Sequence, residues 1–477
     1  MSGMGQYFVA NAVSVATGFL SVVIFVRVFL PAEYGQLSLV TGAIGFAVIV
    51  GTAGLPQSAV RFHWSMEARR VEREFAGSLL IGGAAISALV SVAFALGPQA
   101  ALGMEDGGIA GLLPAAAVGV FWTCVGDLLV GVPRARHETR RYNFGLSLRR
   151  VLALAGSLVL SVGVGLGLRG FLWGLALGEA VACLVLVAAM RSRVVWRFER
   201  AMFVESLAYG GPHLFVVGAG LVLSIVDRYV IQLLLGAEAV GVYVLGVSVA
   251  ATLSGLITRP FNLFLFPAYT KTWETQGASE TSALLSRASE LFLMVYIPLT
   301  LGAFALQNQI VALIAPGDYG TGAQVVGIVF LALMFHGLSS VSAAGLYLTA
   351  KTWRVGVAAL GAAILNVLLN LLLVPRWGVW GAAVVTLISY AAYYGALTAL
   401  SYGILPIPFP VRSLCRYLIA GAIMVAATIW VVRLDLVPLL LGPLTGLIAY
   451  AGVLALVDRK ARAWALQVTG RSVELRP

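Results

Sequence analysis

The sequence predicts an all-α, polytopic membrane protein with about 14 transmembrane helices, arranged as two six-helix lobes around a central cavity plus two extra C-terminal helices. Three observations lead to this fold class. The 477-residue chain is 60% hydrophobic and only 11% charged, whereas soluble proteins carry ~25% charged residues. Apolar stretches of ~20 residues, each long enough to cross a bilayer, recur from end to end. A short phrase also recurs near half length, which is typical of transporters built from repeated lobes.

The recurring phrase reads LPAEYGQLSLV at Leu30–Val40 and GAEAVGVYVL at Gly236–Leu245. Each copy follows one long apolar helix and opens the next. Gly35 and Gly241 match, which gives an offset of 206 residues. This repeat predicts that the second lobe begins shortly before the second copy.

The hydropathy pattern divides the chain into fourteen candidate spans. Short connections around Pro31, Arg169, Gly236, Pro375 and Asp435 predict that the spans on either side run antiparallel. The spans are 6–30, 36–60, 75–97, 109–132, 146–168, 170–190, 206–234, 239–264, 288–314, 322–349, 355–374, 378–401, 413–433 and 436–457.

These spans group into an N-terminal six-helix lobe (1–200), a C-terminal six-helix lobe (201–402), two additional transmembrane helices (403–457) and a cytoplasmic tail (458–477). The first apolar segment is too long for the core of a signal peptide and lacks a basic leader, so we expect it to be a retained span. No loop is long enough to hold a soluble domain.

The net charge of +11 does not indicate nucleic-acid binding, because the basic residues gather on one side of the membrane. When the loops are assigned to alternate sides, 26 of the 31 Lys and Arg residues fall on one side. The other five are Arg27, Arg169, Arg228, Arg376 and Arg433. By the positive-inside rule, this asymmetry places both termini in the cytoplasm. Arg27 alone would favour the reverse orientation for the first span and so needs another explanation.

Three stretches resemble a known family. They are RVFLPAEYGQLSLV at Arg27–Val40, DRYVIQLLLGAEAVGVYVLGVSVA at Asp227–Ala250, and Ala350–Tyr390 with its AKTWR, NVLLNLLLVP and GVWGAAVVTLIS segments. Their order and spacing resemble those of Wzx-type lipid-linked oligosaccharide flippases, which belong to the multidrug/oligosaccharidyl-lipid/polysaccharide exporter superfamily. The resemblance covers most of spans 1–12.

The resemblance implies a V-shaped cavity between the lobes and alternating access. The substrate would be an undecaprenyl-pyrophosphate-linked oligosaccharide, moved from the inner to the outer leaflet for O-antigen, lipopolysaccharide or related surface polysaccharide synthesis. It also implies a bacterial or archaeal cytoplasmic (inner) membrane, contact with membrane lipids, and a polysaccharide polymerase and chain-length machinery as partners. No cofactor or metal is expected, and a coupling ion, H⁺ or Na⁺, is left open.

Cationic residues inside or at the ends of spans are candidates to hold the pyrophosphate, because the planar arginine fork binds phosphate oxygens in pairs. The candidates are Arg27, Arg228, Arg149 and Arg150. The alternatives are that Arg27 reaches the interface, that Arg149 and Arg150 meet lipid headgroups, and that Arg228 forms a structural ion pair. Asp227 and Arg228 point about 100° apart on their helix, so they need not pair with each other.

Isolated carboxylates in spans are candidates for coupling or gating, because removal from water favours the protonated form of an acid. These are Asp127, Glu179 and Asp227. The alternative is a buried acid that joins two helices by hydrogen bonds.

Asn366 and Asn370 lie four residues apart on one helix face, where they could contact sugar or form hydrogen bonds between helices.

Proline and glycine are placed as in helices that bend and pack closely. Pro212 and Pro298 are the hinge candidates, with a fixed kink as the alternative. Gly163, Gly165 and Gly167 suggest close helix packing.

The chain lacks a GxxxxGK[ST] phosphate loop and HExxH, CxxC or catalytic-triad patterns, so we expect a transporter and not an enzyme. The three cysteines fall in apolar helices and suggest neither a disulfide framework nor a metal site. Two alternatives remain. One is an ion-coupled multidrug exporter of the same superfamily, which predicts a less cationic, more aromatic and more acidic cavity. The other is a polysaccharide polymerase or ligase, which would need a long catalytic loop.

Overall fold

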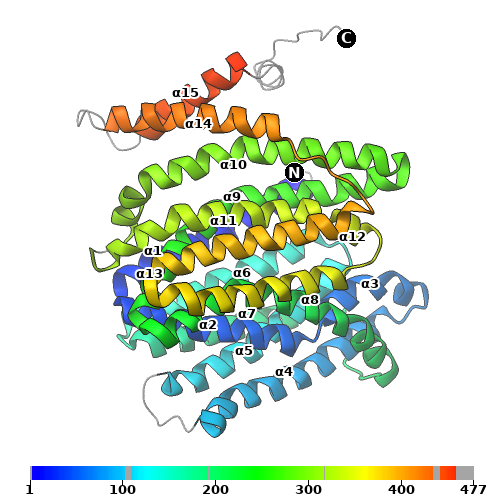
Figure 1. Ribbon diagram of the computed structural model, residues 1–477. Helices are drawn as coiled ribbons and strands as arrows, with labels where there is room; N and C mark the ends of the chain where they lie inside the picture. The colour runs from blue at the N-terminus through cyan, green and yellow to red at the C-terminus, as the bar shows by residue number, and fades with distance from the viewer. Residues whose placement is uncertain (1–2, 103–108, 192, 316, 433–440, 458–477) are drawn as a thin grey trace.

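The computed structural model describes residues 3–102, 109–191, 193–315, 317–432 and 441–457. In these residues all the regular secondary structure is helical, and there is no β-strand. The helices run roughly alongside one another, with α14 and α15 at one edge beside α10 (Figure 1). The all-α fold class is therefore confirmed. The proposed tail, 458–477, lies outside the described residues.

We use "first lobe" for residues 1–200 and "second lobe" for 201–402, as proposed from the sequence. The helices of the first lobe are α1 (Gly3–Val28), α2 (Pro31–Thr52), α3 (Leu55–Ala68), α4 (Glu72–Leu102), α5 (Leu113–Ala135), α6 (Thr139–Leu158) and α7 (Gly167–Met190), with a 3-10 turn at Ala110–Leu112 and a π-turn at Val159–Gly163. Those of the second lobe are α8 (Arg200–Leu235), α9 (Ala237–Gln276), α10 (Ala278–Ile314), α11 (Ala323–Ser342), α12 (Ala344–Leu348) and α13 (Trp353–Tyr402), with a 3-10 turn at Gly317–Gly322. Then follow α14 (Val411–Val432) and α15 (Leu441–Val457).

Eleven segments of the described chain are long and apolar enough to cross a membrane, and Val13–Val28 and Thr445–Leu454 are shorter apolar helices. The 50-residue helix α13 is broken at Gly378, whose φ of 60° and ψ of −144° are not helical. This break falls on the first residue of the predicted span 378–401, just after the predicted span 355–374. The exact number of fourteen spans stays a prediction.

Large apolar side chains cover the outside of the protein. Leu233, Phe264, Ile448 and Leu89 are 78%, 73%, 72% and 71% exposed. A soluble protein rarely leaves so much contiguous apolar surface in water, whereas a bilayer solvates such side chains at no cost. The protein is therefore a multi-pass membrane protein.

The start of α2 is fixed by its own sequence. Pro31 opens the helix with a preset φ, and the Glu33 carboxylate accepts a hydrogen bond from the Leu30 backbone N–H at 3.0 Å. Both features are favourable in the first turn of a helix. In the second copy of the repeat, Gly236 separates α8 from α9 with a φ of 86°, a conformation that glycine adopts readily.

The two copies of the repeat meet each other where α2 and α9 begin. A Cβ atom added to Gly35 would lie 1.9 Å from the Ala237 carbonyl oxygen, and one added to Gly241 would lie 1.8 Å from the Pro31 carbonyl oxygen. The offset of 206 residues that relates Gly35 to Gly241 also relates Pro31 to Ala237. The matched glycines therefore form a reciprocal backbone contact between the lobes, which we call the glycine contact.

Candidate functional site

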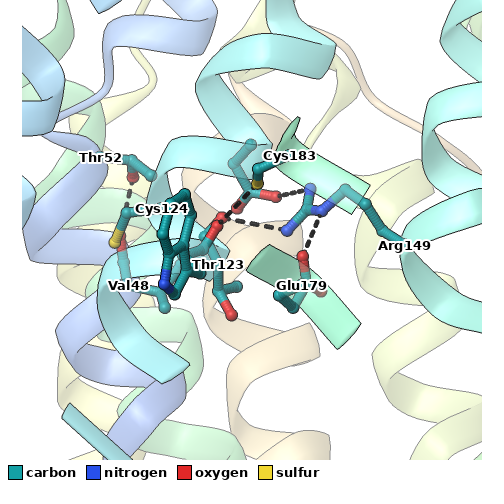
Figure 2. Close-up of polar contacts among 9 residues, drawn as sticks. Val48, Thr52, Thr123, Cys124, Arg149, Glu179 and Cys183 are labelled. Atoms are coloured by element: carbon teal, nitrogen blue, oxygen red, sulfur yellow. Dashed lines mark hydrogen bonds and ion pairs between the residues drawn. The ribbon is translucent and has the colours of Figure 1, made fainter. Parts of the chain in front are cut away.

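Arg149 of α6 joins three helices of the first lobe. Its Nε donates to Glu179 Oε2 of α7 at 2.6 Å, and its Nη1 donates to Asp127 Oδ1 of α5 at 2.7 Å. Its Nη2 donates to the Thr123 carbonyl oxygen at 3.0 Å. Figure 2 shows the guanidinium pointing between α5 and α7. Three residues that the sequence suggested separately thus form one cluster.

This cluster is buried at its centre and open at one side. Arg149 is 5% exposed and Glu179 is 6% exposed, whereas the Asp127 side chain is 42% exposed. Glu179 joins α7 to α6 through a cationic partner, and its coupling role stays a prediction. Arg149, expected as a cavity cation, instead directs all three of its nitrogens to acceptors inside the first lobe.

Small residues beside the charged ones make room for this cluster. A Cβ on Gly126 would lie 2.4 Å from Arg149 Nε, so the guanidinium occupies the space that a larger residue would fill. On α7, Gly174 and Gly178 would place Cβ atoms within 2.3 Å of the α6 backbone. Such small-residue spacing lets membrane helices approach closely and brings Glu179 within reach of Arg149.

The glycines that the sequence suggested for close packing do not serve that purpose. A Cβ atom added to Gly163, Gly165 or Gly167 would meet no atom of another residue within 4 Å among the described parts of the chain. These glycines lie in the π-turn and the connection that follows it, where two of them have positive φ. These glycines allow the backbone to turn, and the close approach of α7 to α6 occurs further along, at Gly174 and Gly178.

Asp127 lines a cavity between the lobes, which we call the Asp127 cavity. Its volume is about 300 Å³, and it is bounded by α2, α3, α5 and α6 of the first lobe and by α8 of the second. Its polar lining residues are Thr52, Gln57, Asp127, Arg134, Tyr142 and His213. Arg150 is exposed and lies one helical turn beyond the lining residue Leu146, but it is not itself part of the lining.

The Asp227 and Arg228 side chains contact different helices, in agreement with the ~100° between adjacent residues of a helix. Asp227 is 4% exposed and faces its own lobe, where it accepts hydrogen bonds from the hydroxyl groups of Tyr243 in α9 and Thr386 in α13. The Arg228 backbone N–H donates to Asp227 Oδ1 at 2.8 Å. In the described residues neither side chain forms a salt bridge within 4.0 Å.

Arg228 reaches across to the first lobe and lines a second cavity, which we call the Arg228 cavity. Its Nη1 donates to Ser38 Oγ at 3.0 Å, and its buried Nε has no hydrogen-bond partner among the described residues. The cavity has a volume of about 220 Å³ and no acidic lining residue in the described part of the chain. It is lined by Ser21, Phe25, Tyr34, Leu37, Ser38, Thr41, Phe171, Arg228, Val244 and Ser248.

Asn366 and Asn370 share one face of α13, as predicted, and bond to each other. Asn370 Nδ2 donates to Asn366 Oδ1 at 2.7 Å, and the two residues are 1% and 0% exposed. Neither lines the Asp127 or the Arg228 cavity.

Pro212 and Pro298 lie inside the continuous helices α8 and α10, and their role as hinges stays a prediction.

Arg27, expected in the cavity, lies instead at the junction of the lobes. Its Nη2 donates to the Leu313 carbonyl oxygen at 2.6 Å, and its Nε donates to the Ile314 carbonyl oxygen at 3.0 Å. These carbonyls end α10, where a helix presents unpaired acceptors and partial negative charge. This contact gives the basic residue near the end of the first span a pair of acceptors in the second lobe.

We expect the substitution Arg27→Gln to lower the free energy of unfolding by about 1 kcal/mol, because a cation that caps a helix C-terminus contributes about 0.3–1 kcal/mol plus its hydrogen bonds. The thermal unfolding midpoint of the purified protein in detergent measures this effect. Arg376→Gln, which removes another exposed arginine, is the matched control and should leave the midpoint unchanged. Equal midpoints for the two variants would contradict the capping role.

Several residues of these sites were not singled out from the sequence. Ser38 binds Arg228, and Tyr243 and Thr386 bind Asp227. Ser38 and Tyr243 both lie in the recurring phrase, so the repeat was the sequence feature that could have drawn attention to them. Gln57 and Arg134 of the Asp127 cavity had no distinguishing pattern, because their convergence depends on packing between helices distant in sequence.

Comparison with known proteins gives both a family and a fold. The model of a family described as "Polysaccharide biosynthesis protein" matches residues 24–319. The probable flippase AglR of Haloferax volcanii is 26% identical over 171 residues. That stretch is 35% of this chain and 35% of AglR, so the match spans about a third of the relative's length.

Two groups of solved structures share the fold. The lipid II flippase MurJ in an inward closed conformation matches with a TM-score of 0.76 and 14% identity, over 96% of this chain and 99% of MurJ. An inward-facing multidrug resistance MATE family transporter of the MOP superfamily matches with a TM-score of 0.69 and 13% identity, over 84% of this chain and 98% of that one. At these identities the likeness establishes the fold.

Proposed function

The chain belongs to the polysaccharide biosynthesis protein family, and on that premise we propose that it is a flippase that moves a lipid-linked oligosaccharide across the membrane. The substrate would be an undecaprenyl-pyrophosphate-linked repeat unit, carried from the inner to the outer leaflet for surface polysaccharide synthesis. Transport would proceed by alternating access of the two lobes. Both termini would lie in the cytoplasm. The start of α2, which follows the first span, would then lie on the outer side of the membrane, so the glycine contact would close that side.

The observation that carries this proposal is the Arg228 cavity. The guanidinium of Arg228 faces a space between the lobes and forms no salt bridge within 4.0 Å in the described residues, and its buried Nε has no hydrogen-bond partner there. Hydroxyl groups of Ser21, Ser38, Thr41 and Ser248 come from three other helices around the same space. A guanidinium with neutral hydroxyl donors suits a phosphate group, since Arg binds phosphate oxygens in pairs.

Asp227 supports the idea of ion coupling. It is buried in the second lobe, its partners are neutral hydroxyl and amide groups, and the Arg228 guanidinium is directed away from it toward α2. A buried carboxylate that forms no direct ion pair is less favourable than a paired one and is a candidate to take up a proton or a cation. We propose that Asp227 is the site through which an H⁺ or Na⁺ gradient biases the lobes.

The membrane of action would be the bacterial or archaeal cytoplasmic membrane, and the partners would be membrane lipids together with a polysaccharide polymerase and its chain-length machinery. The family match and the basic residues of the loops on one side support this placement. The O-antigen is one candidate product among the surface polysaccharides that use such lipid-linked repeat units.

Deletion of the protein tests the function. In cells pulse-labelled for the lipid-linked sugar, we expect the labelled lipid to accumulate in the cytoplasmic leaflet. We expect complementation with Arg228→Ala to restore less than about a tenth of wild-type export. A charge-assisted hydrogen bond contributes ~1.5–3 kcal/mol. Because ~1.4 kcal/mol corresponds to a tenfold change in affinity, losing this bond should weaken substrate binding by roughly tenfold or more. Arg228→Lys keeps the charge without the planar fork and should restore export in part.

The control is Arg376→Ala, an exposed arginine outside both cavities, which should complement fully. Membrane levels of each variant are measured by immunoblot, so that loss of protein is separated from loss of transport. Unchanged glycan export in the deletion strain, together with new sensitivity to cationic drugs, would contradict the proposal and favour the multidrug exporter.

A further inference from the structure

The Asp127 cavity has a composition unlike that of the Arg228 cavity, although α2 lines both. It combines a carboxylate, a guanidinium, an amide, an imidazole and a phenol, contributed by Asp127, Arg134, Gln57, His213 and Tyr142. Such a wall offers hydrogen-bond donors and acceptors in one small space, with charges of both signs. It can therefore satisfy a polar ligand that carries no net charge.

Asp127 is held in a fixed orientation with one face toward this cavity. Arg149 binds its Oδ1 at 2.7 Å, and Arg149 itself is fixed by Glu179 and by the Thr123 carbonyl oxygen. Arg149 donates to Oδ1, and 42% of the Asp127 side-chain surface remains exposed. A carboxylate oxygen held this way is a preorganised acceptor for hydroxyl groups.

The charges decide which part of a lipid-linked saccharide each cavity suits. A carboxylate on the wall repels a phosphate, so the pyrophosphate is favoured at Arg228, whose described lining has no acid. Sugar hydroxyls are neutral, and each can donate to Asp127 while accepting from Arg134, Gln57 or His213. Tyr142 adds an aromatic surface for the apolar face of a sugar ring.

Position and size agree with this division. Thr41 lines the Arg228 cavity and Val48 lines the Asp127 cavity, so the nearest parts of the two walls lie about 10 Å apart along α2 at ~1.5 Å per residue. The Asp127 cavity, at about 300 Å³, is at the small end of the ~300–1,000 Å³ that is usual for small-molecule sites. It has room for a sugar residue but not for a whole repeat unit.

We propose that the Asp127 cavity is a glycan-recognition subsite, in which Asp127 accepts hydrogen bonds from a sugar of the repeat unit and so contributes to the choice of glycan. This inference rests on the proposed flippase function and deepens it. Arg149 acts there as a positioning residue. The ligand class is an uncharged sugar residue of a polyprenyl-diphosphate-linked oligosaccharide.

The test compares two probes that share the polyprenyl diphosphate, one with the glycan and one without it. One is the lipid-linked oligosaccharide extracted from host cells that lack the polymerase, and the other is undecaprenyl diphosphate. Binding of each to the purified full-length protein in detergent is measured by native mass spectrometry. Asp127→Asn should weaken binding of the glycan-bearing lipid about tenfold, a loss typical of one good polar contact, and leave undecaprenyl diphosphate unchanged.

Two further variants keep the test independent of folding. Gln57→Leu removes a donor from α3 without touching the Arg149 cluster and should reduce glycan-lipid binding in the same selective way. Glu205→Gln neutralises an exposed acid on α8 outside the cavity and should change neither probe. Thermal unfolding midpoints identify any variant that has lost its fold.

The outcomes separate the two proposals. If Asp127→Asn and Gln57→Leu bind both probes as the wild type does, or weaken both equally, the glycan subsite is wrong while the flippase function stands. If the wild type binds neither probe and the deletion strain exports glycan normally, the proposed function fails as well. Selective loss of the glycan-bearing lipid in both cavity variants supports the subsite.

Discussion

Replacing Gly35 or Gly241 by alanine is expected to prevent the lobes from closing where α2 and α9 begin. The new Cβ atom would lie 1.9 Å from the Ala237 oxygen or 1.8 Å from the Pro31 oxygen. These obstacles are backbone atoms, which cannot rotate away as the end of a side chain can. The two helices must therefore separate before either alanine fits.

The expected magnitude follows from the energy of overpacking. Forcing an extra methyl group into a close contact costs about 1–3 kcal/mol, which corresponds to a shift of roughly 5- to 150-fold between closed and open states. We expect export to fall by at least about fivefold and the Arg228 cavity to become accessible from the side of the glycine contact. Labelling of Ser38→Cys by an impermeant maleimide, in a background with Cys415→Ser, measures that accessibility.

Gly45→Ala is the matched control, because Gly45 lies on the same helix α2. The nearest atom to its added Cβ is a Leu221 side-chain carbon at 3.8 Å, which is an ordinary contact. This variant should transport as the wild type does, and in the Ser38→Cys, Cys415→Ser background it should label no faster than that background without Gly45→Ala. Normal transport by Gly35→Ala, or an equal defect in Gly45→Ala, would show that the glycine contact does not have to close.

Arg149→Met is expected to destabilise the protein by about 3–5 kcal/mol, because removing one partner of a buried ion pair leaves an uncompensated charge. Here the loss affects two acids, since Glu179 is buried and Asp127 shares the same guanidinium. The Thr123 carbonyl oxygen also loses its donor. We expect a large drop in the thermal unfolding midpoint and in the amount of protein recovered from the membrane.

The neighbouring residue provides the control. Arg150→Met removes an adjacent but exposed arginine and should change the unfolding midpoint little. The triple variant Arg149→Met, Asp127→Asn, Glu179→Gln should be more stable than Arg149→Met alone, because the acids no longer carry charge. A triple variant less stable than the single one would indicate that packing of the arginine, and not its charge, stabilises the lobe.

The sequence predicts the fold class well, because hydropathy and the repeat depend on local patterns that a membrane imposes directly. It also predicts that Asp227 and Arg228 point apart, since helix geometry alone determines that. Other features depend on packing between distant segments. Asp127, Arg149 and Glu179 each stood out as charges in apolar surroundings, but nothing local showed that they would meet.

A signal for that meeting was present in the neighbours of the two acids. Gly126 precedes Asp127 and Gly178 precedes Glu179, and in both places the glycine allows the close approach that brings an arginine to the acid. Arg27 shows the opposite limit. Its position at the end of a span suggested a ligand-binding cation, whereas its partners are carbonyl groups of α10, almost three hundred residues away in sequence.

The glycine contact has the symmetry of an isologous interface, in which the same two surface elements face each other across a two-fold axis. In a homodimer of identical lobes, one substitution would alter such an interface twice. In the fused chain the two halves of the contact are encoded separately, so each glycine can be replaced alone. The effects of Gly35→Ala and Gly241→Ala on closure can therefore be measured separately. A larger effect of one substitution would show which side of the contact is less able to accommodate an added methyl group.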